Sequence, residues 1–331
     1  MKAHRHPTDR PFPHPASLAL AALLGCAPLP ALALPAVADA AAADTYRQSR
    51  DDAWWTGPMM ANSAETLPPG HFLAEPYLYD VRSAHADGFG SRTYLLYGLA
   101  ERLTVGVIPV FGYNRPDGAP GSRGAGMGDF TVQAQYRLTE FQEDGWLPTT
   151  AVMLQETLPT GHYDRLVRPA DGMGSGAYGT TLGFNAQTYL WMPNGRILRL
   201  RLNLSASRSG RARVRGASVY GTDDGFRGSA RPGNAYGIDA SVEYSLTRRW
   251  VLAMDFLYNR NGSTRVTGRA RAGLPHDLRM ESGRSDAYGI APAVEYSWTP
   301  NVGVLLGTRV IFGGHRTPSS VTPAIAINYV H

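Results

Sequence analysis

The sequence predicts an all-β protein: a transmembrane up-and-down antiparallel β-barrel of about 12 strands, with short periplasmic turns and longer extracellular loops. Three observations predict this class: a glycine-rich composition with few charges, segments in which apolar and polar residues alternate, and connections that are short and long in turn. Of 331 residues, 37 are glycine, 43% are hydrophobic and only 18% are charged. A mean hydropathy of −0.24 is too polar for a bundle of membrane helices. The hydrophobic content is too high for a wholly disordered chain.

The N-terminal region has the pattern of a secretory signal peptide, predicted over residues 1–38. Lys2 and Arg10 belong to a basic start, and the apolar stretch 16–27 is too short to span a bilayer. Ala36-Val37-Ala38 fits a cleavage site with small residues. Export through this signal predicts a location in the outer membrane of a Gram-negative cell.

A second processing route stays open for the same region. Leu23-Leu24-Gly25-Cys26 is similar to a bacterial lipoprotein box, in which Cys26 would become the acylated first residue. Cys26 is the only cysteine of the chain. Removal of residues 1–38 would therefore leave a mature protein without thiols or disulfides, which suits an oxidising compartment.

Alternation with a period of two marks the strands. In 129–139, Phe130, Val132 and Tyr136 lie on one face, and Gln133 and Arg137 lie on the other. A strand places successive side chains on opposite faces, so this segment has one apolar and one polar side. The same pattern recurs at 197–207, 236–246, 250–258, 288–298 and 321–331, and more weakly at 71–80, 92–99, 103–113, 149–158, 178–192 and 302–312.

The connections between these strands alternate in length, as they do in outer-membrane barrels. Short turns fall near 100–102, 140–147, 193–195, 247–249 and 299–301. Longer loops rich in Gly, Arg and Asp fall at 81–91, 114–128, 159–177, 208–234, 260–286 and 313–320. Aromatic residues at the strand ends predict two interfacial belts, with Tyr178, Tyr236 and Tyr288 at one end and Tyr244, Trp250, Tyr296 and Trp298 at the other.

Two regions follow the signal. Residues 71–331 are expected to form the barrel, and residues 39–70 precede its first strand. The distinctive stretch of the latter is Trp54-Trp55-Thr56-Gly57-Pro58. This region is either a plug inside the lumen or a loose periplasmic lead, and the sequence does not decide between them.

Three short motifs carry a resemblance to a known family. Gly126-Met127-Gly128-Asp129 resembles its strand entry, the stretch 97–103 its hairpin turn, and Leu158-Pro159-Thr160-Gly161 its later loop entry. Over roughly residues 57–331 the chain resembles the outer-membrane β-barrel family named for the meta-pathway of phenol degradation. The resemblance implies passage of aromatic or other apolar compounds across the outer membrane.

The parity of the strands also predicts which polar residues line the lumen. A charged side chain facing lipid at mid-depth costs about 2–4 kcal/mol for Arg or Lys, so charges on strands belong inside. The predicted lumen-lining residues are Arg137, Arg199, Arg201, Asp239, Glu243, Asp255, Glu295 and Arg309. We expect the glutamates and Asp255 to form an acidic stripe in the periplasmic half, with Arg199 and Arg201 at its edge. These side chains either line a conduit or fill a narrow barrel.

The function predicted first is a porin-like channel or uptake barrel for a small, aromatic or apolar solute. The alternatives are a structural or lipid-interacting barrel that transports nothing, and an outer-membrane hydrolase using His162 or His276. The protein is not expected to be an enzyme, because no Gly-x-Ser-x-Gly motif occurs in the mature chain. No catalytic, cofactor or metal site is expected; the adjacent Asp223 and Asp224 are a weak metal signal.

The expected partners follow from the predicted location. Loop arginines such as Arg211, Arg213 and Arg215 could bind phosphates of outer-membrane lipids and lipopolysaccharide. The C-terminal strand is expected to be read by the barrel-assembly machinery, although His331 occupies the place of the usual terminal aromatic. The net charge is +5, but the arginines are spread along the chain, so no nucleic-acid partner is expected.

Overall fold

The computed structural model describes residues 47–270 and 277–331. The predicted signal peptide, including Cys26, lies outside the described residues. No helix in the described part of the chain is long and apolar enough to cross a membrane. The helical elements of the described residues are two short 3-10 turns, η1 (Arg50–Asp52) and η2 (Pro169–Asp171).

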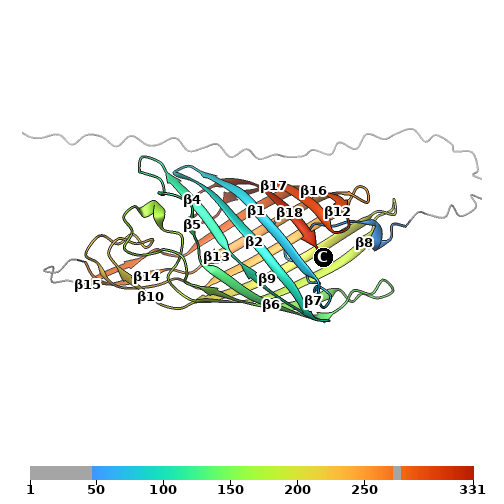
Figure 1. Ribbon diagram of the computed structural model, residues 1–331, viewed down its shortest axis with the longest axis horizontal. Helices are drawn as coiled ribbons and strands as arrows, with labels where there is room; N and C mark the ends of the chain where they lie inside the picture. Colours follow the sequence, from blue (N-terminus) through green and yellow to red (C-terminus); the bar gives the residue numbers. More distant parts are fainter. Residues whose placement is uncertain (1–46, 271–276) are drawn as a thin grey trace, which may run out of the picture. The chain divides into compact units, whose positions relative to one another are not determined.

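The strands form a closed antiparallel barrel of 12 strands, which confirms the predicted class (Figure 1). Each strand pairs with its neighbour along the chain, and β1 pairs with both β2 and β18, which closes the sheet. The barrel strands are β1 (Phe72–Ser83), β2 (Ala86–Ala100), β3 (Leu103–Ile108) continued by β4 (Val110–Pro116), β6 (Phe130–Thr139), β7 (Thr149–Leu158), β8 (Gly179–Trp191), β9 (Ile197–Ser209), β12 (Ala235–Ser245), β13 (Trp250–Asn261), β16 (Ser285–Thr299), β17 (Val302–Gly313) and β18 (Ser320–Val330).

The two faces of the barrel wall differ in polarity as the alternation predicts. The outward residues are large and apolar, for example Leu204, Phe256 and Leu306, which are 41%, 51% and 63% exposed. The inward residues include Asn185 and Gln187, which are buried. Such an arrangement suits a wall with lipid outside and polar side chains inside, and the closed sheet pairs the backbone groups of the wall with one another.

The predicted strand 103–113 is interrupted at Pro109. On one side β3 and β4 both pair with β2, but on the other side β3 pairs with β6 whereas β4 pairs with the short β5 (Gly126–Met127). Proline has no backbone N–H to donate to the sheet, so the pairing partner changes there. The Pro109 carbonyl accepts a hydrogen bond from Thr93 N at 3.1 Å.

One prediction about the long loops was wrong. The segment 81–91 is not a loop, because β1 and β2 extend through it to a tight connection between Ser83 and Ala86. The predicted long loops 208–234 and 260–286 connect barrel strands as expected, but their described residues contain strands of their own. They contribute β10 (Ala212–Arg215), β11 (Arg227–Arg231), β14 (Arg265–Arg269) and β15 (Asp277–Glu281) to a four-stranded sheet beyond the loop end of the barrel (Figure 1).

This second sheet forms because its strands also alternate. Val214, Phe226, Ala230 and Val266 are buried on one face and pack with Ala212 and Ala177 into a small core. The opposite face carries the exposed arginines Arg213, Arg215, Arg227, Arg231, Arg265, Arg269 and Arg279. The loop residues therefore bury enough apolar surface to fold as a sheet.

Candidate functional site in the barrel lumen

Residues 48–68, which we call the lumen segment, run among the inward-facing side chains of the barrel. The segment is anchored first at the end of the barrel that carries the short turns. Gln48 donates from Nε2 to Ser245 Oγ at 2.8 Å, and its carbonyl accepts from Trp191 Nε1 at 2.9 Å. Its backbone N donates to the Gly195 carbonyl at 2.9 Å. The segment therefore begins at a fixed point of the periplasmic rim.

Two buried carboxylates bind backbone amides of the lumen segment. Glu295 Oε2 accepts from Thr56 N at 2.8 Å, from Thr56 Oγ1 at 3.0 Å and from Gly57 N at 3.0 Å. The Asp255 carboxylate accepts from Met60 N at 3.2 Å and from Ala61 N at 3.1 Å. A coil inside a barrel has no strand partner for its N–H groups, so side chains of the wall must supply the acceptors.

A buried ion cluster lies beside these contacts. Arg199 donates to both oxygens of Glu243, with Nε to Oε2 at 2.7 Å, and Arg201 Nε lies 3.0 Å from Glu243 Oε2. Arg201 also donates to the carbonyl of Ala61 at 2.8 Å, and the Arg199 guanidinium lies 4.3 Å from the ring centroid of Trp55. A buried charge is tolerated when it is paired and hydrogen-bonded; Arg199 and Glu243 meet both conditions, and Arg201 is paired with Glu243 and hydrogen-bonded to the Ala61 carbonyl.

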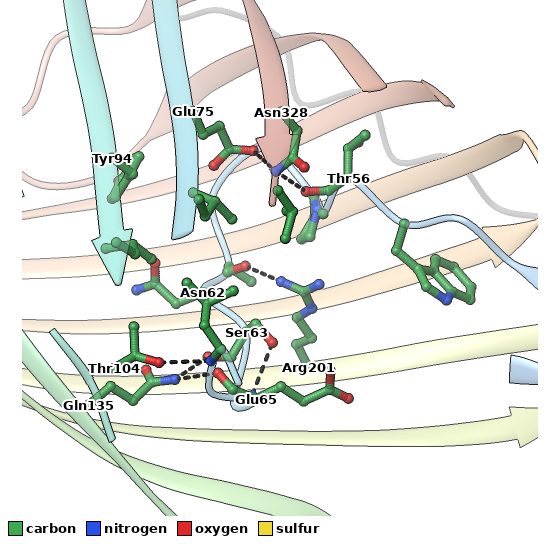
Figure 2. A pocket seen from close by; sticks show the side chains of 18 of the residues that line it. Thr56, Asn62, Ser63, Glu65, Glu75, Tyr94, Thr104, Gln135, Arg201 and Asn328 are labelled. Atoms are coloured by element: carbon green, nitrogen blue, oxygen red, sulfur yellow. Dashed lines mark hydrogen bonds between the residues drawn. The ribbon is translucent and has the colours of Figure 1, made fainter. Parts of the chain in front are cut away.

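Amides and hydroxyls hold the last part of the lumen segment. Gln135 Nε2 donates to the carbonyls of Ser63 at 3.0 Å and Glu65 at 2.8 Å, and Leu67 N donates to Thr104 Oγ1 at 2.8 Å. Figure 2 shows these side chains converging on the segment from different strands. Further bonds join Asn62 to Asn203, and Glu65 to Gln187 and Tyr189. The contacts thus continue along the segment from its first residue to Leu67.

The predicted lumen-lining residues occupy different surroundings. Arg199, Arg201, Glu243, Asp255 and Glu295 are all buried and contact the lumen segment or each other. Glu243, Asp255 and Glu295 lie on the consecutive strands β12, β13 and β16, and Arg199 and Arg201 lie on β9 and pair with Glu243, which is the acidic stripe with arginines at its edge that the sequence predicts. Asp255 and Glu295 are matched by backbone amides instead.

The three remaining predicted residues lie outside this cluster. Arg137 is at the end of β6 next to a short turn and pairs with Glu140 at 3.3 Å. Asp239 has a buried Oδ1 without a hydrogen-bond partner in the described residues. Arg309 lies on β17 towards the loop end, where its buried Nε has no such partner either.

Two cavities flank the lumen segment. The first, of about 320 Å³, lies between the segment and the wall and includes Glu75, Tyr94, Gln135 and Asn328 (Figure 2). In it, Asn328 Nδ2 donates to Glu75 Oε1 at 3.1 Å. The second, of about 290 Å³, lies nearer the loop end and is lined mainly by tyrosine, methionine and arginine side chains.

Sequence reasoning did not single out several residues of this site. Glu75, Arg92 and Tyr94 lie on strands whose alternation was weak, and Gln48 and Glu65 lie in a region without any periodicity. Strand parity could have identified Arg92 and Tyr94, because residues two apart on a strand lie on the same face and both of these face inward. No comparable signal exists for a coil that is bound through its backbone.

The histidines considered for a hydrolase are not assembled with other groups in the described residues. His162 is exposed, and only its backbone carbonyl is hydrogen-bonded, to the amides of Met173 and Gly174. His276 lies outside the described residues. In the described part of the chain, no three His, Cys, Asp or Glu side chains are grouped so that they could hold a metal ion.

Solved structures and a family model are similar to this chain. The COG4313 outer membrane channel from Pseudomonas putida F1 aligns with 82% of this chain and 100% of its own, at 15% identity and a TM-score of 0.65. The NanC porin aligns with 77% of this chain and 98% of its own, at 12% identity and a TM-score of 0.43. No curated protein matches the chain.

The fold and the family model agree. The structural likeness at a TM-score of 0.65 shows that the fold is that of an outer-membrane β-barrel. The family model matches residues 57–322, from the Thr56-Gly57-Pro58 stretch of the lumen segment to the last strand. The chain therefore belongs to the outer-membrane β-barrel family described as "Putative MetA-pathway of phenol degradation".

Proposed function

We propose that the protein is an outer-membrane uptake channel for small aromatic or apolar molecules. The observation that carries this proposal is the cavity beside the lumen segment, in which tyrosine and methionine side chains lie together with two arginines. Small-molecule sites are typically concave and largely apolar with a few placed polar groups. The family description, which names phenol degradation, and the outer-membrane channel from Pseudomonas putida support the same assignment.

Residues 39–46 of the predicted 39–70 region lie outside the described residues; we further propose that the lumen segment, residues 48–68, acts as a plug rather than as a loose periplasmic lead. The support is the series of hydrogen bonds from Gln48 to Leu67, which involve side chains of several different strands. A segment held at so many points blocks free diffusion through the lumen, so passage requires it to move. In this proposal the segment limits uptake to solutes that bind beside it.

Uptake of a labelled aromatic compound tests the channel. Cells with an intact outer membrane, with and without the gene, receive radiolabelled toluene or benzyl alcohol at low concentration, where the outer membrane limits entry. We expect faster entry in cells that carry the gene. Equal rates, with the barrel present in the outer-membrane fraction, would contradict transport and favour a structural or lipid-interacting barrel.

The remaining partners are proposals of the same kind. The exposed arginine face of the second sheet suits phosphate groups of lipopolysaccharide, since guanidinium groups bind phosphate in a bidentate manner. The outward residues Ile325, Ile327 and Tyr329 of β18 suit recognition by the barrel-assembly machinery. We propose export through the signal in residues 1–38. A mature N-terminus near Asp39 supports it, and an acylated Cys26 would show the lipoprotein route.

A further inference from the structure

The cavity nearer the loop end of the barrel combines aromatic side chains with two arginines. It is bounded by four consecutive strands, β17, β18, β1 and β2, and by Met59 and Met60 of the lumen segment. Tyr77 and Tyr94 meet edge to face on its wall, with ring centroids 6.0 Å apart. These side chains form an apolar, aromatic surface on which a ring could lie.

The arginines of this cavity lack carboxylate partners. Arg92 lies opposite Tyr77 in register, and Arg309 lies opposite Thr322. No Asp or Glu lines the cavity, and neither arginine forms an ion pair in the described part of the chain. The two guanidinium groups carry like charges and line the same cavity, so they repel each other.

Two polar atoms in the cavity wall are buried and unsatisfied among the described residues. These are Arg309 Nε and Thr322 Oγ1, which lie on neighbouring strands at paired positions. A buried donor without an acceptor is costly, so such atoms indicate a missing partner. An oxygen-bearing anion between Arg92 and Arg309 would supply the acceptor and offset the repulsion.

The nearby carboxylates cannot fill this role because they are engaged elsewhere. Glu75 is held by Asn328, and Asp255 by the amides of Met60 and Ala61. Glu243 is bound by Arg199 and Arg201. Since no carboxylate is among the lining residues of the cavity, an acceptor for these donors would come with a ligand.

We infer that this cavity binds small aromatic carboxylic acids, with the carboxylate between Arg92 and Arg309 and the ring against Tyr77 and Tyr94. The inference rests on the proposed uptake function and names the class of solute. At neutral pH a carboxylic acid is ionised whereas a phenol is not, so the pair of arginines selects the acid over the phenol or alcohol. Arg309 and Thr322 together supply donors for both carboxylate oxygens.

Binding to the purified full-length barrel in a neutral maltoside detergent tests the inference. Isothermal titration calorimetry compares benzoate with benzyl alcohol, which keeps the ring, and with acetate, which keeps the charge. We expect benzoate to bind at least about tenfold more tightly than either, the factor of one charge-assisted hydrogen bond. Equal affinity of benzoate and benzyl alcohol would overturn the inference.

Variants of the two arginines test whether they cause the preference for benzoate. Arg309→Gln and Arg92→Gln are expected to remove the preference for benzoate, and Arg309→Lys to retain part of it by keeping the charge. Arg102→Gln, in an exposed periplasmic turn, is the matched control and should bind as the unaltered protein does. Unboiled gel mobility verifies that each variant is a folded barrel. A preference that survives in the folded Arg92→Gln, Arg309→Gln double variant would refute the assignment.

Uptake in cells separates this inference from the function on which it rests. If benzyl alcohol enters faster in cells that carry the gene, but the purified barrel does not bind benzoate more tightly, the anion site is refuted and the channel function is retained. If neither benzoate nor benzyl alcohol enters faster in cells that carry the gene, the channel function itself is refuted. Gene-dependent entry of benzoate that is lost in Arg309→Gln supports both.

Discussion

Replacing Glu295 with alanine should release the lumen segment from the barrel wall. One oxygen of this fully buried carboxylate accepts hydrogen bonds from Thr56 N, Thr56 Oγ1 and Gly57 N. Alanine provides no acceptor for these donors. The segment would then have to leave unsatisfied N–H groups inside the barrel or move to where water can reach them.

The size of the effect follows from the contacts. Hydrogen bonds to a charged acceptor contribute about 1.5–3 kcal/mol each, and three are lost. Burial of the carboxylate itself costs several kcal/mol, and the alanine variant no longer bears that cost. The net loss in local stability is therefore about 3 kcal/mol, which corresponds to about a hundredfold increase in the open population of the segment.

Hydrogen exchange measured by mass spectrometry on the detergent-solubilised protein reports this population directly. The amides of Thr56 and Gly57 should exchange about a hundredfold faster in Glu295→Ala, while the β12 and β13 amides keep their protection. Glu140→Ala, at an exposed position near a periplasmic turn, is the matched control and should change nothing in the segment. Unchanged exchange at Thr56 in a folded Glu295→Ala barrel would refute the role given to this carboxylate.

Three further outcomes are expected from the same interior. Arg199→Ala or Glu243→Ala leaves the other buried charge without its partner and should lower the free energy of unfolding in urea by about 3–5 kcal/mol. Arg211→Ala, in an exposed loop, should stay within about 0.5 kcal/mol, and equal losses would contradict the ion cluster. Glu243→Gln with Glu295→Gln should shift the selectivity of an open channel in planar bilayers towards anions; unchanged selectivity would refute this. Gly98→Ala puts a Cβ 1.9 Å from a carbonyl oxygen of the lumen segment, so it should displace the segment and raise conductance; an unaltered conductance would argue against plugging.

The barrel could be predicted from the sequence because its wall obeys a local rule. Leu198, Leu200 and Leu202 alternate with Arg199 and Arg201, and that alternation alone indicates which face meets lipid. The register between strands then follows from the short turns. The inward positions of Glu243 and Glu295 were therefore accessible without a structure.

The groups that bind Glu243 and Glu295 were harder to predict from the sequence. Glu295 binds backbone amides of Thr56 and Gly57, and a backbone amide has no sequence signature. The acidic stripe could be predicted because it depends on side-chain charges and strand parity alone. The second sheet was missed because β10 and β14 have only four and five residues, too few for periodicity to stand out from an Arg-rich loop.

The lumen segment also has a consequence for the order in which the protein assembles. It leaves the ribosome before every strand that holds it, and Thr56 meets Glu295 and Asn328, 239 and 272 residues further along the chain. The contact with Asn328 needs β18, the last strand of the chain, and contacts between residues so far apart in the sequence form slowly. We therefore expect the segment to dock only after the strands that hold it have paired.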